Sequence, residues 1–171
     1  MFSFDIMKNH FIKANSEWDA GNFYRAFRLF LAGAKAGDVS CQASLGYFYD
    51  NGIGVSKDPT KAFHWYLRAC EEGQDPVAAH NLAILYREVG DLQNAKKYFM
   101  LAVELGDPDS LIELAELAVK SGDLLNAEKL LKQLLAQDKS TVIPSVRQQA
   151  HRKLKKIFEE NAKVKNGPSS D

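Results

Sequence analysis

The sequence has few cysteines, no long apolar run and no excess of either charge. Its two cysteines, Cys41 and Cys70, are too few for a disulfide framework and lack the paired spacing of a zinc site. No window of about 18 apolar residues occurs and no basic segment precedes an apolar stretch at the N-terminus, so we expect no membrane span and no secretory leader. Basic and acidic residues both number 22, so no net charge attracts nucleic acid or membrane. These absences predict a cytoplasmic protein.

Catalytic and metal-binding patterns are also missing. The four histidines lie in separate segments, without the helical spacing that brings two ligands to one metal ion. The glycine-rich segment 51–54 lacks the Gly-Lys-Ser/Thr of a phosphate-binding loop. We therefore predict no catalytic residue, no metal and no cofactor.

What the sequence does contain is a repeat. Four alanines share one pattern: Asn or Asp stands four residues before each, large apolar residues follow three and four positions later, and Gly or Asp stands eleven positions after. An N-cap, an apolar helix face and a helix-ending residue at these positions indicate one helix per copy. The alanines, separated by 36, 33 and 32 residues, are Ala26, Ala62, Ala95 and Ala127.

A second amphipathic helix precedes each of these helices. Asp75-Pro76 and Asp107-Pro108 open two of them, each with an N-cap followed by proline at the first helical position. In the first copy we place Trp18, not Glu17, in the core, because an unpaired carboxylate is costly to bury. The apolar stripe of that helix is then Phe4, Met7, Phe11, Ala14 and Trp18.

A two-helix unit of about 34 residues predicts an all-α fold, an α-solenoid of about four antiparallel helix–turn–helix repeats with a C-terminal capping helix. We expect one repeat domain over residues 1–162, with repeats at about 5–37, 39–73, 75–106 and 108–138. The cap helix spans 145–162, and residues 163–171 form a disordered tail. The apolar face of the cap is Val146, Ala150, Leu154, Ile157 and Phe158.

Residues 43–73 closely resemble the Sel-one-like repeat family, whose repeats are related to tetratricopeptide repeats. The resemblance is carried by Leu45-Gly46, Tyr49, the loop Gly52-x-Gly54-Val55, Asp58, Lys61-Ala62 and Trp65-Tyr66. The other three units lack the Gly-x-Gly-Val loop and have the shorter turns of tetratricopeptide repeats.

This resemblance implies a non-enzymatic adaptor or scaffold that binds another protein or a peptide on a curved surface. Some secreted relatives carry disulfides between successive repeats. The matching positions here pair Cys70 with Ala78 and Ala34 with Cys41, so each bridge lacks one cysteine. This departure favours a reducing compartment.

The helical period of about 100° per residue indicates which side chains face the concave groove. Tyr47 and Arg87 are the expected anchors because Tyr and Arg are enriched at interface hot spots, and Asn81 can bond a peptide backbone. An alternative is that this row is solvated or covered by the next helix. The predicted protein-binding residues are Ser44, Tyr47, Asp50, His80, Asn81, Ile84, Arg87, Glu113 and Glu116.

Two other functions remain open. The resemblance to some bacterial family members also implies an immunity or inhibitor protein that occludes a toxin or enzyme, and residues 104–128, with seven acids and one base, would be its docking surface. A hydrolase using Cys41 or a histidine is the less favoured alternative. Residues 147–165 carry seven bases and two acids, but without interleaved aromatics we expect a solvated face and no nucleic-acid partner. We expect a monomer.

Overall fold

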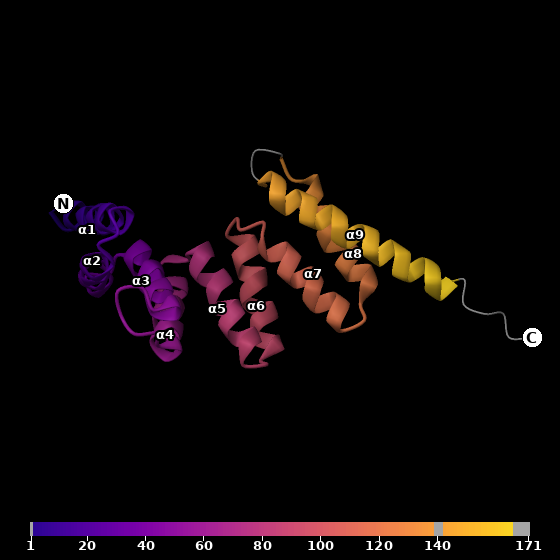
Figure 1. Cartoon of the computed structure of the whole chain (residues 1–171), viewed down its shortest axis with the longest axis horizontal. Coiled ribbons are helices and arrows are strands. Elements are labelled where there is room, and N and C mark those ends of the chain that lie inside the picture. Colours follow the sequence, from indigo (N-terminus) through magenta and orange to yellow (C-terminus); the bar gives the residue numbers. More distant parts are fainter. Residues whose placement is uncertain (1, 139–141, 166–171) are drawn as a thin grey trace, which may run out of the picture. The chain divides into compact units, whose positions relative to one another are not determined.

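The computed structural model describes residues 2–138 and 142–165, with side chains described over 10–138 and 142–159. This part of the chain contains nine α-helices in two compact units, Met1–Leu105 and Gly106–Asp171 (Figure 1). The prediction of an all-α chain is confirmed, whereas that of one domain over residues 1–162 stays a prediction. The helices are α1 (Phe2–Asp19), α2 (Phe23–Lys35), α3 (Val39–Asn51), α4 (Pro59–Gly73), α5 (Pro76–Glu88), α6 (Leu92–Glu104), α7 (Ser110–Lys120), α8 (Leu124–Ala136) and α9 (Pro144–Lys165).

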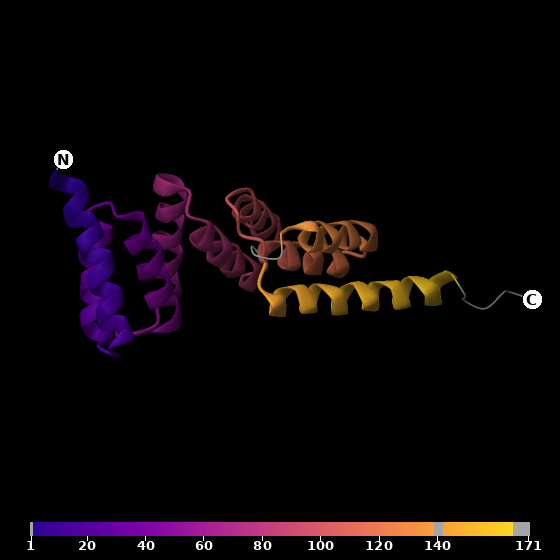
Figure 2. The ribbon, with the colours of Figure 1, turned by 90° about the horizontal axis from the view of Figure 1, so that it is seen from above.

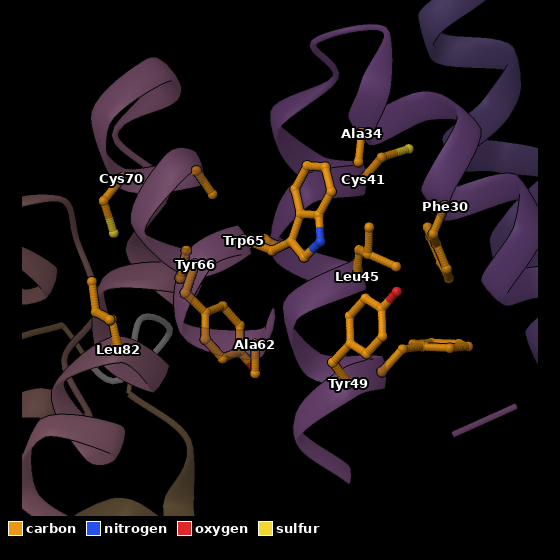
Figure 3. Close-up of a cluster of buried hydrophobic side chains, with 14 of the residues drawn as sticks. Phe30, Ala34, Cys41, Leu45, Tyr49, Ala62, Trp65, Tyr66, Cys70 and Leu82 are labelled. Carbon is orange, nitrogen blue, oxygen red and sulfur yellow. The ribbon is translucent and has the colours of Figure 1, made fainter. Parts of the chain in front are cut away.

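The first unit consists of three helix pairs, α1 with α2, α3 with α4, and α5 with α6. Successive pairs pack through α2 on α3 and α4 on α5, and Figure 2 shows α1 to α4 side by side. The alanines that define the repeat are fully buried in this unit, namely Ala26, Ala62 and Ala95. Their small methyl groups allow neighbouring helices to pack closely at these positions. Large side chains such as Phe30 and Tyr66 fill the space between the pairs (Figure 3). The predicted repeat register is confirmed.

Aspartate side chains start most of the helices as predicted. Asp58, Asp75 and Asp91 each accept a hydrogen bond from the backbone N–H three residues later, at 2.8–3.0 Å. Asn22 differs, because its amide donates to the Glu17 carboxylate at 2.8 Å and makes no cap bond. The Asn22 side chain, which was predicted to cap α2, is therefore bound to the Glu17 carboxylate at the end of α1.

One glycine predicted to end a helix has another role. Gly37 and Gly106 take the left-handed conformation, with φ of 89° and 99°. Gly73 instead is the last residue of α4, and Gln74 takes the left-handed conformation with φ of 51°. A Cβ at Gly73 would lie 2.4 Å from the methyl carbons of Val39. Gly73 therefore serves the close packing of α4 on α3.

The loop that carries the Gly-x-Gly-Val motif packs against the preceding repeat. Gly52 ends α3 in the left-handed conformation, and Gly54 repeats that conformation with φ of 65°. A Cβ at Gly54 would lie 2.4 Å from the carbonyl oxygen of Phe23, at the start of α2. Only glycine fits so close to another backbone segment.

The second unit consists of the pair α7 and α8, with α9 packed on α8. α7 begins at Ser110, two residues later than the predicted proline start, because the N–H groups of Leu111 and Ile112 bond carbonyls three residues back, at 3.1 and 3.0 Å, and not four. The Asp107 carboxylate still accepts from the Ser110 backbone N–H at 3.1 Å, as a cap does. The Arg147 guanidinium of α9 donates to the carbonyls of Leu135 (2.7 Å) and Gln137 (3.0 Å) at the end of α8. This cation satisfies acceptors that the helix end leaves open.

The apolar face predicted for the cap helix is confirmed for Val146, Ala150, Leu154 and Ile157, which are buried. Phe158 was predicted on this face but is 49% exposed. Its ring lies 5.9 Å from the Lys132 ammonium, so a charged residue of α8 meets it where an apolar neighbour was expected. The helix is described to Lys165, and residues 166–171 of the predicted tail lie outside the described residues.

Candidate functional site

A groove of about 350 Å³ lies in the first unit between α1, α3 and the start of α5. Three of the predicted binding residues, Ser44, Tyr47 and Asn81, contribute to its wall. The lining residues are Phe11, Trp18, Ser40, Ala43, Ser44, Tyr47, Asp75, Val77 and Asn81.

The groove has an aromatic wall. The Trp18 and Tyr47 rings lie 5.8 Å apart between centroids, and Trp18 also contacts the core ring of Phe48 at 5.2 Å. Tyr47 is 39% exposed and Val77 is 60% exposed, because both point away from the helix faces that form the core. Apolar surface that the fold leaves in contact with water gains free energy when a partner covers it.

Polar groups stand among the apolar ones. The Ser44 hydroxyl donates to the Ser40 carbonyl at 2.8 Å. Asp75, the only charged residue among the described residues that line the groove, caps α5 through the Ala78 N–H at 2.8 Å. The half-buried amide of Asn81 offers both a donor and an acceptor. The groove can therefore hold an apolar group and bond a few polar atoms around it.

Four predicted residues of the same unit are absent from the groove. The Arg87 guanidinium lies over the core ring of Phe99, 5.7 Å from its centroid, and the His80 ring packs on Phe99 at 5.6 Å. Asp50 does not line the groove either. Its carboxyl is partly buried, which raises its pKa, and the nearby Lys57 lowers the pKa while Glu88 raises it. Ile84 is half-buried. Helical spacing along α3 and α5 does not show which neighbours these side chains contact.

Glu113 and Glu116 belong to the second unit, where four acidic residues have structural roles. The Glu116 carboxylate forms an ion pair with Lys153 of α9. Glu128 pairs with Lys132, and Asp107 and Asp123 cap helix starts. Because these charges are already partnered inside the unit, the structure gives no support to an acidic surface built for docking a toxin or enzyme.

The sequence interpretation missed two groove residues, Phe11 and Trp18. Both were assigned to the buried stripe of the first helix, and both are only partly buried. Their seven-residue spacing places them on one line of α1, which was the available signal. The contact of Trp18 with Tyr47 depends on how two repeats pack, so no pattern within one helix reveals it. Phe4 and Met7, assigned to the same stripe, have side chains outside the described residues.

Cys41, the cysteine proposed for a hydrolase, is poorly suited to that chemistry, and Cys70 resembles it. Burial raises the pKa of Cys41 and of Cys70 to about 12, so both thiols stay protonated and are weak nucleophiles. Figure 3 shows the two side chains on different sides of their repeat. Among the described residues no group of three or more His, Cys, Asp or Glu side chains could hold a metal ion. No described helix is long and apolar enough to cross a membrane.

Comparisons with known proteins agree with the motif and the fold. Residues 20–38 and 39–74 match the Sel1 repeat, and residues 77–105 match the tetratricopeptide repeat. A Sel1-like repeat-containing protein of Acanthamoeba polyphaga mimivirus is 32% identical over 87 residues, which are 51% of this chain and 16% of that protein. The chain therefore spans a small part of this relative.

Solved structures with the same fold include two Sel1-type proteins. A Sel1 repeat protein from Oxalobacter formigenes superposes with a TM-score of 0.72 and 19% identity, over 94% of this chain and 64% of that one. A protective antigen of uropathogenic Escherichia coli gives a TM-score of 0.69 and 19% identity, over 91% of this chain and 38% of that one. Residues 20–74 therefore match Sel1 repeats and residues 77–105 match a tetratricopeptide repeat, in a chain whose paired helices have the fold of such repeat proteins.

Proposed function

We propose that the chain is a non-enzymatic adaptor that binds a segment of another protein in the groove of its first unit. The observation that carries the proposal is the groove itself, where the exposed Tyr47 and Val77 stand beside Trp18. Repeat folds of this kind present extended concave surfaces, and their repeats typically mediate protein interactions.

The lining suggests how a segment binds. An apolar side chain of the partner packs against Trp18, Tyr47 and Val77, residues that offer aromatic and aliphatic surface of the kind found at hot spots. The Asn81 amide bonds the partner's backbone, whose donors and acceptors it matches. The occupant is therefore an extended or helical segment with at least one large apolar side chain.

The two thiols favour a reducing compartment such as the cytoplasm for this adaptor. Cys41 and Cys70 are both free and buried. Neither has a cysteine at the position that forms an inter-repeat bridge in secreted relatives. The fold therefore does not depend on a disulfide bond, which would need an oxidising compartment to form.

A capture experiment tests the groove. The double variant Tyr47→Ala/Val77→Glu removes the exposed ring of the aromatic wall and places a charge in the groove. The matched control Tyr24→Ala/Val89→Glu makes the same chemical changes at exposed positions outside the groove. Wild type and both variants are used as bait in a lysate of the native cells, and captured proteins are quantified by mass spectrometry.

We expect a partner whose capture falls at least about tenfold in the groove variant and less than about twofold in the control. Circular dichroism of both variants shows whether each is folded. Equal capture by the groove variant, in a folded state, would contradict the proposal. A separate single variant, Arg87→Ala, tests the sequence-based expectation that Arg87 anchors the partner. Because the Arg87 side chain packs on Phe99 outside the groove, we expect this variant to leave capture unchanged.

A further inference from the structure

The second unit contains a hollow of about 200 Å³ between α7, α8 and α9. Its floor is apolar, formed by Ala115, Val119, Leu131 and Ile157. Its rim is charged, formed by Glu116, Lys120, Lys153 and Lys156. An apolar floor with a charged rim is the arrangement of a site that takes an apolar group carried by a charged ligand.

The rim is positive after its internal ion pair is counted. Glu116 is neutralised by Lys153, which reaches it from α9. Lys120 and Lys156 are exposed and form no ion pair with any side chain that the structure describes. Two ammonium groups, one from α7 and one from α9, therefore flank the hollow without a compensating carboxylate among the described side chains.

The volume of the hollow limits the size of the apolar group that it can hold. Pockets that enclose drug-sized molecules usually measure roughly 300 to 1,000 Å³, so this hollow suits one large side chain better than a whole organic ligand or an acyl chain. Val119, at its edge, is exposed and available for contact.

We propose that this hollow binds an acidic peptide segment of a partner protein, which places a leucine-sized side chain on the floor and its flanking carboxylates against Lys120 and Lys156. The occupant differs from that of the groove in the first unit, where the described lining residues include one charged group, the carboxylate of Asp75. The Asp75 carboxylate repels an acidic segment from the groove, whereas Lys120 and Lys156 attract it to the hollow. This site stands independently of the function proposed above.

The test uses three synthetic peptides and methyl NMR spectra of the full chain. The first peptide has two leucines flanked by two glutamates on each side. The second replaces the leucines with glycines, and the third replaces the glutamates with lysines. We expect only the first to shift the methyl signals of Val119 and Ile157, and we expect its affinity to fall as the salt concentration rises.

Charge-reversal variants locate the site. Lys120→Glu/Lys156→Glu reverses the free cations of the rim, and we expect it to weaken the first peptide at least about tenfold. The matched control, Arg152→Glu/Lys155→Glu, reverses two exposed cations of α9 that do not line the hollow, and we expect a change below about threefold. Equal weakening in both variants, equal binding of the lysine peptide, shifts of the Ala43 and Val77 methyl signals of the groove instead, or no shift at millimolar peptide would each overturn the proposal.

Discussion

Tyr66 has a hydroxyl group that is buried in the core without a hydrogen-bond partner among the described residues. Its ring packs on Gly46, where a Cβ would lie 2.6 Å from the ring carbon Cδ1. Burial raises the pKa of this hydroxyl, and the nearby Asp50 raises it further. The ring therefore contributes to packing, whereas the hydroxyl loses its hydration without compensation.

We predict that Tyr66→Phe increases the free energy of unfolding by about 1 kcal/mol, because it removes an unsatisfied polar group and keeps the ring. Urea denaturation followed by circular dichroism measures the change. Tyr24→Phe, at an exposed position, serves as the control and should have no effect. A decrease in stability for Tyr66→Phe would mean that the hydroxyl is hydrogen-bonded, and it would count against this packing.

Asp91 makes the start of α6 sensitive to pH. Hydrogen bonds from the side chain and the backbone of Asn94 hold the pKa of the Asp91 carboxyl below its ordinary value. A carboxyl whose pKa is lower in the folded state stabilises the fold above its ordinary pKa, and this contribution is lost as the pH falls through the folded-state value.

We therefore predict that Asp91→Asn reduces the fall in melting temperature between about pH 6 and pH 3, since asparagine caps a helix but carries no titrating charge. Thermal melts of wild type and variant across this range provide the measurement. Parallel curves for the two proteins would show that the carboxylate at Asp91 does not contribute to the pH dependence.

The loop of residues 52–58 is the element that distinguishes the Sel1-type repeat from the shorter turns elsewhere in the chain. Gly54 in this loop and Gly90 in the α5–α6 turn both have positive φ, of 65° and 82°. A Cβ at Gly54 meets the backbone of Phe23, whereas a Cβ at Gly90 has no atom within 4 Å. The two positions share the backbone strain and differ in the steric conflict.

This pair yields a matched prediction. Gly90→Ala should cost about 1 kcal/mol, from the left-handed conformation alone. Gly54→Ala should cost about 2 to 4 kcal/mol, because the loop must also move away from α2. Chemical denaturation of both variants gives the comparison, and equal costs would show that the loop does not depend on its close approach to Phe23.

Elements whose signal is local were predictable from the sequence. The alanine register, the caps at Asp58 and Asp91 and the buried face of α9 depend on residues within one helix, and the structure contains them as predicted except for the exposed Phe158. Features that depend on a neighbour were not predictable. Asn22 bonds Glu17, and Arg87 packs on Phe99, and neither contact follows from helical spacing.

The groove falls between these two cases. Spacing along α3 and α5 correctly placed Tyr47 and Asn81 on one side. The contribution of α1, through Phe11 and Trp18, arises only when the first two repeats pack, because Trp18 contacts Phe30, Phe48 and Tyr47 from different helices. A candidate site in a repeat protein is therefore incomplete until the packing between its repeats is known.

At the scale of the whole molecule, the two compact units differ in how much core each encloses. The unit Met1–Leu105 has three helix pairs, with two interfaces between successive pairs. The unit Gly106–Asp171 has one pair and α9. Repeat proteins gain stability from neighbour interfaces, and about three repeats are needed before the array is stable.

We predict that a fragment of residues 1–105 folds alone, with the helical circular dichroism and cooperative urea transition of a repeat array, and keeps the groove. A fragment of residues 106–171 should unfold at a lower urea concentration, because a short chain buries a smaller share of its surface. If the first fragment is unfolded, the three pairs need residues beyond Leu105 for their stability. If the second fragment is the more stable of the two, the contacts of α9 through Arg147 and Lys153 stabilise the single pair α7–α8 strongly. They then contribute more stability than the two interfaces between the three helix pairs of the first unit.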